Sequence, residues 1–285
     1  MNIKYECLYC ITRQITKLAK KLTDDVDIQH KIISFGLKTV SENWMDSSAP
    51  YVTGLIYEYA KEISGIEDPY AEEKSEFNVI SQQLIEEFAL VDRIKSSDDA
   101  IDTAIRLSIA GNIIDFSLGI DIDKDSVRDS VENSLIKNMY GINSIEFMEK
   151  VNKAEKILFL ADNAGEIVFD KLLLELLPLD KITYVVKGGA IVNDAIMKDV
   201  EEIELDKIVR VIDNGTSIQG TELRVCSESF LKEFDEADLI ISKGQANYES
   251  LESVGEKDII FLLRAKCKTI ADMIGCQVGE FCALG

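Results

Sequence analysis

Five short apolar runs recur at regular intervals in the second half of the chain. They are rich in Ile, Val and Leu and do not alternate polar with apolar residues, which is typical of strands buried on both faces. Helical patterns separate them, and successive runs begin about 20 to 30 residues apart, as in βαβ units. We therefore predict an α/β fold with a doubly wound parallel sheet. The predicted strands are 156–161, 182–187, 207–212, 238–243 and 258–263.

The first half of the chain has a different pattern. In the segment 11–22, Ile11, Ile15, Leu18 and Leu22 recur at helical spacing. Amphipathic runs at 77–94 and 98–116 repeat this pattern, and the run at 126–141 begins at a Ser and ends at a Gly. We predict a helical N-terminal domain over residues 1–150 and an α/β domain that binds metal and phosphate over residues 151–285.

Composition limits the classes of function. The chain has 285 residues and a formal net charge of −21, with 31 basic and 52 acidic residues. This balance argues against nucleic acid as a partner, because such binding relies on Lys and Arg. An anionic substrate would need a local metal ion or local cations. The sequence contains no apolar run long enough for a membrane span and no signal peptide, so we expect a cytoplasmic protein without membrane contact. A homodimer is compatible with the sequence but not required by it.

Polar and Gly-rich segments follow the predicted strands. Because parallel strands share one carboxyl edge, and ligands bind in the crevice outside it, these segments should converge there. In strand order, the segments contain Asp162 and Asn163; Lys187 to Gly189 with Asn193 and Asp194; Asp213 to Gly215; Lys243 to Asn247; and Arg264 to Lys266.

These residue types suit metal-assisted phosphoryl chemistry. Carboxylate and amide oxygens are ligands for hard divalent ions, and a metal with open positions can accept a phosphate oxygen and a water molecule. Lys243 and Lys266 could pair with the phosphate. The sole His, His30, lies in a helical pattern and offers little basis for a His mechanism. The alternative for Asp162 and Asp213 is that each caps a helix or turn.

Two further features leave alternatives open. Asn112 and Asp115 lie three residues apart in an apolar helical run, so they either complete a buried polar network or reach the site. Cys7 and Cys10 form a CxxC pair that could hold a structural soft metal with Cys276 or Cys282. A disulfide or free thiols are the alternatives for the cysteines.

Several motifs together resemble a known family. The segments "CLYC", "AGNIIDF", "ADNAGE", "KGGAIVNDA", "SKGQANYE" and "LLRAKC" resemble, in order, the metal-dependent damage-control phosphatases, long catalogued as domain of unknown function eighty-nine. The Cys pair resembles the prokaryotic branch. The resemblance covers nearly the whole chain and implies a helical part followed by a Rossmann-like α/β part. It also implies hydrolysis of small phosphometabolites in a house-cleaning role, with Mg, Mn, Co or Ni.

The resemblance assigns roles to particular residues. It implies that Asp162, Asn163 and Asp194 bind the metal and that Lys266 holds the phosphate. It also implies that the pocket for the small phosphorylated metabolite is lined by Gln245, Ala246, Asn247, Tyr248 and Glu249. The attacking group would be either Asp162 or a water on the metal. The eukaryotic branch resembles "GDLNYR" where this chain has "GQANYE", and the missing acid and Arg argue against a sugar phosphate.

Two rival functions remain open from the sequence. One is an S-adenosylmethionine-dependent carboxyl methyltransferase, which a Gly-rich turn after the first strand would favour. The segment "ADNAGE" has a single Gly and presents an acid instead. The other is a non-catalytic binder of nucleotides or phosphometabolites, which would not need Asp194.

Overall fold

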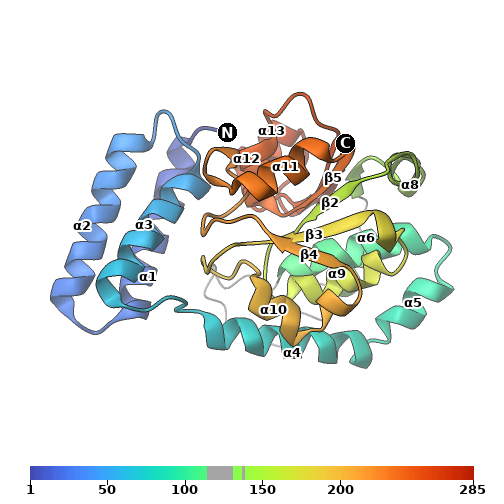
Figure 1. The fold of residues 1–285 in the computed structure, drawn as a ribbon, viewed down its shortest axis with the longest axis horizontal. Helices are drawn as coiled ribbons and strands as arrows, with labels where there is room; N and C mark the ends of the chain where they lie inside the picture. Colours follow the sequence, from blue (N-terminus) through green and yellow to red (C-terminus); the bar gives the residue numbers. More distant parts are fainter. Residues whose placement is uncertain (114–130, 137–138) are drawn as a thin grey trace.

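The computed structural model describes residues 1–113, 131–136 and 139–285, and a seven-stranded sheet organises them (Figure 1). The strand order is β1-β7-β6-β5-β2-β3-β4. The strands are β1 Met139–Gly141, β2 Ile157–Leu160, β3 Ile182–Val186, β4 Arg210–Asp213, β5 Leu239–Lys243, β6 Ile259–Arg264 and β7 Phe281–Leu284. Neighbours are parallel except β6 and β7, which are antiparallel.

The α/β fold class and all five predicted strands are confirmed, with bounds that differ by a few residues at most. The sequence analysis missed β1 and β7 at one edge of the sheet, and it was wrong to extend the helical run at 126–141 over the residues of β1. Both are short: β1 has three residues and β7 four. Runs of this length carry too little pattern to separate a strand from a loop.

Helices occupy the first third of the chain and the connections between strands. The longer ones are α1 Tyr5–Leu22, α2 Val26–Asn43, α3 Ala49–Ser64, α4 Ala71–Glu87, α5 Leu90–Ser96, α6 Ala100–Ala110, α8 Ser144–Lys153, α9 Glu166–Leu174, α10 Met197–Glu202, α11 Glu228–Glu236, α12 Gln245–Leu251 and α13 Lys268–Ile274. Short 3-10 turns are η1 Gly111–Ile113, η3 Leu179–Lys181, η4 Leu205–Lys207 and η5 Leu223–Val225. None of these described helices is long and apolar enough to cross a membrane.

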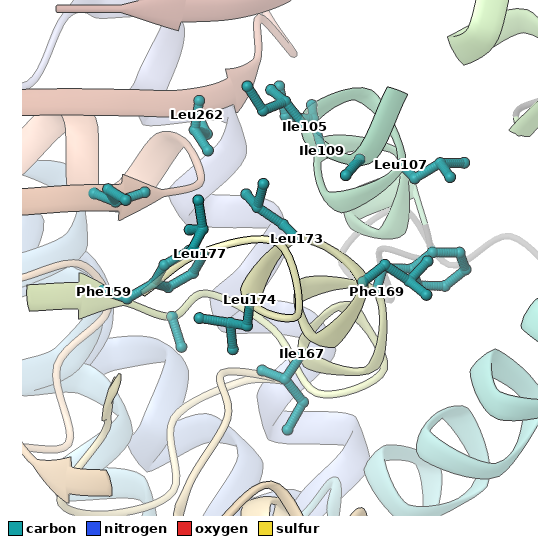
Figure 2. Packing of buried hydrophobic residues seen from close by; sticks show 14 of the residues in the cluster. Ile105, Leu107, Ile109, Phe159, Ile167, Phe169, Leu173, Leu174, Leu177 and Leu262 are labelled. Carbon is teal, nitrogen blue, oxygen red and sulfur yellow. The ribbon is translucent and has the colours of Figure 1, made fainter. Parts of the chain in front are cut away.

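The sheet separates two apolar layers. Alternate residues of β2 point to opposite faces, so Phe159 packs with α6 and α9 while Leu158 and Leu160 pack with α11, α12 and α13. Figure 1 shows α11 to α13 on one side of the sheet and α4, α6, α9 and α10 on the other. Figure 2 shows Ile105 and Ile109 of α6 near Leu173 of α9 and Leu262 of β6. These contacts pack α6 against β6 and α9 against α6 on this face of the sheet.

Helices α1 to α3 form a separate bundle at one end of the molecule (Figure 1). Its apolar cluster includes Ile191 and Val192 from the loop after β3. The bundle therefore lies beside the carboxyl edge of the sheet. In contrast, α4 to α6 share their core with the sheet, so the apolar core crosses the predicted boundary at residue 150. The division into 1–150 and 151–285 stays a prediction.

Candidate active site

The carboxyl end of β2 lies where the chain changes direction across the sheet. Strands β3 and β4 follow on one side of β2, and β5 and β6 on the other. A crevice opens at such a switch point in open α/β sheets, because the connections leave in opposite directions. Asp162 and Asn163 follow β2 directly, and the switch point therefore presents their side chains to the predicted site.

The loop after β3 folds back onto the loop after β2. Asn163 and Asp194 form an isolated antiparallel bridge. The amide of Ala195 donates to the carbonyl of Asp162 at 2.9 Å, and the amide of Ala164 donates to the carbonyl of Asn193 at 2.8 Å. These backbone bonds bring together the three residues expected to bind metal, from positions about thirty apart in the chain.

Burial and mutual repulsion raise the pKa values of the site carboxyls. Burial and the negative charge of Asp194 together raise the pKa of Asp162 to about 6, although the positive charges of Lys266 and Lys187 oppose the shift. Burial likewise raises the pKa of Asp194 to about 6 against the opposing charge of Lys187. The Lys187 Nζ lies 3.7 Å from Asp194 Oδ2. Two cations therefore act on this acidic pair.

Asn112 reaches the site from the helical half of the chain. Its Nδ2 donates to Asp162 Oδ2 and to Glu166 Oε2, both at 2.6 Å. Gly111 permits this position, because a Cβ there would lie 2.9 Å from the Phe169 ring. Both alternatives left open for Asn112 therefore apply: its bond to Glu166 completes a buried polar network, and its bond to Asp162 brings it to the candidate site. Asp115 lies outside the described residues.

Lys243 has a different environment from the one the sequence led us to expect. Its side chain is fully buried, and Nζ donates to Glu166 Oε1 and Asp170 Oδ1, both at 2.6 Å, and to the carbonyl of Ser108 at 3.1 Å. All three ammonium protons are thus engaged inside the protein. The structure does not support pairing of Lys243 with a phosphate; the residue neutralises two buried carboxylates behind the site.

The segment after β5 forms the first turns of α12 and divides into two roles. Asn247 is fully buried; its Nδ2 donates to the carbonyls of Ala161 and Lys243, and its Oδ1 accepts from Thr221. These bonds tie the ends of β2 and β5 together, so Asn247 has no group left for a substrate.

Gln245 and Glu249 face the loop after β6. Gln245 Nε2 donates to Glu249 Oε1 at 2.8 Å, and its Oε1 accepts from the amide of Lys266 at 3.2 Å. The positive charge of Lys266 lowers the pKa values of both Glu249 and Asp162, so the loop after β6 contributes a cation to the electrostatics of the site. The half-buried Ala246 and Tyr248 lie on the same helix, where the Tyr248 ring packs edge-on against Phe261.

Helix α4 supports the site from outside the sheet. Asn78 Oδ1 accepts from the amide of Gly165 at 2.7 Å, in the loop that follows Asp162. Its Nδ2 donates to Asp199 Oδ1 at 3.3 Å and Glu202 Oε2 at 3.0 Å. Asp199 also binds the fully buried Lys74. One amide side chain therefore joins the segments that follow β2 and β3.

The sequence analysis considered three other residues, which lie in different settings. Asp213 is exposed, and its carboxylate accepts a hydrogen bond from the amide of Gly215 at 2.8 Å. It therefore caps a turn, which was the alternative to a role in the site. Asn193 is buried and supports the loop through its carbonyl. The single histidine, His30, is exposed on α2.

The cysteine arrangement departs from the predicted pairing. Cys276 and Cys282 lie 3.7 Å apart in the layer beside α13. Burial is the main cause that raises the pKa values of the Cys7 and Cys10 thiols. The thiol of Cys267 raises both pKa values further. All six cysteines are free thiols. A structural metal at Cys7 and Cys10 stays a prediction.

The donor atoms of the site fit a hard divalent cation. Within the described residues, His, Cys, Asp and Glu side chains form no group of three that could hold a metal, so amide oxygens would have to complete a ligand set around the acidic pair. Asp194 Oδ2 and Asn112 Oδ1 are buried acceptors that have no hydrogen-bond partner in the described part of the chain. Carboxylate and amide oxygens in such a position suit Mg²⁺ or Mn²⁺.

A separate cavity of about 650 Å³ lies at the opposite edge of the sheet. Its lining includes the amino ends of β2, β3 and β4 and mixes acidic with basic side chains, and none of the predicted site residues belongs to it. The chemistry-bearing groups therefore do not coincide with this cavity.

The sequence analysis missed Glu166 and Asp170 as parts of the site, and it placed Lys187 at the shared strand edge without giving it a role. Glu166 resembles an ordinary acidic residue in the first turn of a helix. A signal was present, because Glu166 and Asp170 stand four apart on one face of the otherwise apolar helix α9. Burial raises the pKa of Glu166 to about 7, and the charge of Lys243 opposes this shift.

Comparison with known proteins gives a consistent result. The family model for the damage-control phosphatase ARMT1-like domain matches residues 3–281. The chain is 34% identical to damage-control phosphatase PH1575 of Pyrococcus horikoshii, over 95% of this chain and 93% of that protein. It is also 34% identical to a damage-control phosphatase of Archaeoglobus fulgidus, over 99% of each. The crystal structure of a DUF89 family protein from Pyrococcus horikoshii matches with a TM-score of 0.87 and 31% identity, over 100% of this chain and 99% of that one.

Proposed function

The chain belongs to the damage-control phosphatase ARMT1-like family, and we propose that it hydrolyses small phosphorylated metabolites with the help of a divalent metal ion. This would give it a house-cleaning role. The names of the relatives from Pyrococcus horikoshii and Archaeoglobus fulgidus support a phosphatase. They favour this function over the methyltransferase and over a non-catalytic binder.

One observation carries the proposal. Asp162, Asn163 and Asp194 come together at the switch point of the sheet, and Asp194 keeps a buried oxygen without a hydrogen-bond partner in the described residues. Lys187 and Lys266 offset only part of the cost of burying this acidic pair, because the pKa values of Asp162 and Asp194 stay raised to about 6. A bound cation would offset the rest. Mg, Mn, Co and Ni are the candidates for that cation.

The site residues would divide the work of hydrolysis. When bound, the metal would polarise the phosphoryl oxygens and lower the barrier to attack at phosphorus. Lys266 would pair with the phosphate of the substrate, because its charge already acts on Asp162 from the loop after β6. Gln245 would hold Lys266 in place through the backbone amide of that residue. Asp162 would either attack phosphorus or hold the attacking water.

The test uses the purified, metal-stripped protein with p-nitrophenyl phosphate. Mg, Mn, Co and Ni are restored one at a time, and the release of p-nitrophenolate is followed. We expect release with at least one metal and none without. Release that is equal with and without metal would overturn the proposed metal dependence, and an absence of release with every metal, extended to a panel of phosphometabolites, would overturn the phosphatase proposal.

A further inference from the structure

Asn112 has a buried oxygen that the rest of the protein leaves unused. The side chain is only 2% exposed. Its Nδ2 donates to Asp162 and Glu166, and these bonds fix the amide orientation, since ionised carboxylates only accept hydrogen bonds. Oδ1 is therefore the remaining atom, and it finds no donor within the described residues. A buried acceptor without a partner is unfavourable unless something else binds it.

We propose that Asn112 Oδ1 is a further ligand of the divalent metal, alongside Asp162, Asn163 and Asp194. The inference rests on the proposed function, because it presumes the metal. It adds a ligand from the helical half of the chain, so the site is complete only when η1 lies against α9. The ligand class is a hard divalent cation, which prefers amide and carboxylate oxygens.

Glu166 orients this amide together with the amide of Asn163. Its Oε2 accepts from Asn112 Nδ2 at 2.6 Å and from Asn163 Nδ2 at 3.1 Å. Its other oxygen is held by Lys243 at 2.6 Å. Because one fixed carboxylate occupies both amide nitrogens, the oxygens of both amides are left for a cation. Glu166 and Lys243 are thus positioning residues for the two amide ligands.

The test measures Mn²⁺ binding to metal-stripped protein without substrate, from the electron paramagnetic resonance signal of free Mn²⁺. Asn112→Ala removes the oxygen and the amide nitrogen; Asn112→Asp keeps an oxygen but loses the nitrogen. We expect Asn112→Ala to weaken binding about tenfold or more, and Asn112→Asp to bind more tightly than Asn112→Ala. Asn43→Ala, which makes the same chemical change on α2, where Nδ2 donates to the carbonyl of Thr39, should bind as the wild type does.

Each alternative outcome has a distinct meaning. Affinity of Asn112→Ala within twofold of the wild type would overturn the inference while leaving the metal-dependent function intact. Equal weakening by Asn112→Ala and Asn112→Asp would show that the amide nitrogen alone matters, which also overturns it. A wild type that binds neither Mn²⁺ nor the other candidate metals would overturn the proposed metal dependence and the inference together. If Asn112→Ala does not fold, Asn112→Ser, whose side chain is too short to replace the amide, takes its place.

Discussion

The carboxylate of Asp162 lies directly against the backbone of Gly244. A Cβ added to Gly244 would stand 1.9 Å from Asp162 Oδ2, and Gly244 has a φ of +77°. The carboxylate of Asp162 therefore fits against the end of β5 only because Gly244 has no side chain. Both the space and the backbone conformation select glycine at this position.

Gly244→Ala should displace Asp162 and thereby disable the site. We expect loss of metal binding and of hydrolysis, together with lower stability, because Ala is strained at positive φ and collides with the carboxylate. Gly255→Ala is the matched control, since a Cβ there meets nothing within 4 Å. Metal titrations and thermal unfolding of both variants check this. Wild-type metal affinity in Gly244→Ala would contradict the described contact.

Lys243→Met should destabilise the protein strongly. The substitution leaves Glu166 and Asp170 buried without their cation, and breaking such a pair costs about 3 to 5 kcal/mol. Urea unfolding of metal-stripped protein measures this change. The control is Lys38→Met, which removes an exposed ion pair with Glu42 on α2 and should leave the unfolding midpoint unchanged. A small loss for Lys243→Met would mean that Lys243 is not the group that neutralises this pair.

Asn78→Ala should loosen both loops of the proposed metal site. It removes the acceptor for the amide of Gly165 and the donor to Asp199, at an expected cost of about 1 to 3 kcal/mol in stability. Metal affinity should fall as well, although Asn78 binds no metal itself. Asn43→Ala makes the same chemical change on α2, where Nδ2 donates only to the carbonyl of Thr39, and should leave metal affinity unaltered. Calorimetric titration with Mn²⁺ compares the two variants.

The pH dependence of stability should report the buried acidic pair. The pKa values of Asp162 and Asp194 are raised to about 6 in the folded protein, whereas Asp titrates near about 3.9 in an unfolded chain. Between these values the folded state binds more protons, so its stability falls as pH rises and the cost is fully present above about 6. Relative to a double Asp162→Asn, Asp194→Asn variant, metal-stripped wild type should lose thermal stability from about pH 4 to about pH 7. A constant difference would contradict the raised pKa values.

The sequence predicted the sheet and the site to different extents. The strands β2, β3, β5 and β6 were recognisable because each is buried on both faces and rich in Ile, Val and Leu. The outer strand β4 is partly exposed and was recognised from its Ile and Val content and its spacing from β3. The convergence of Asp162, Asn163 and Asp194 followed from the shared carboxyl edge of parallel strands. The roles of Lys243 and Asn247 did not follow, because burial decides whether a polar side chain faces the substrate or the core. Asn78 and Gly244 depend on contacts between distant segments, which spacing along one chain does not encode.

The measurement that tests the account most directly compares two Asp-to-Asn variants. Asp162→Asn and Asp213→Asn each alter an acid at or just after the end of a strand, but Asp162 is buried in the site while Asp213 is exposed in a turn. Metal-dependent hydrolysis of p-nitrophenyl phosphate is followed for both, beside the wild type. We expect Asp162→Asn to lose activity at least about a hundredfold and Asp213→Asn to stay within twofold of the wild type. Retained metal-dependent activity in Asp162→Asn would contradict the assignment of the site.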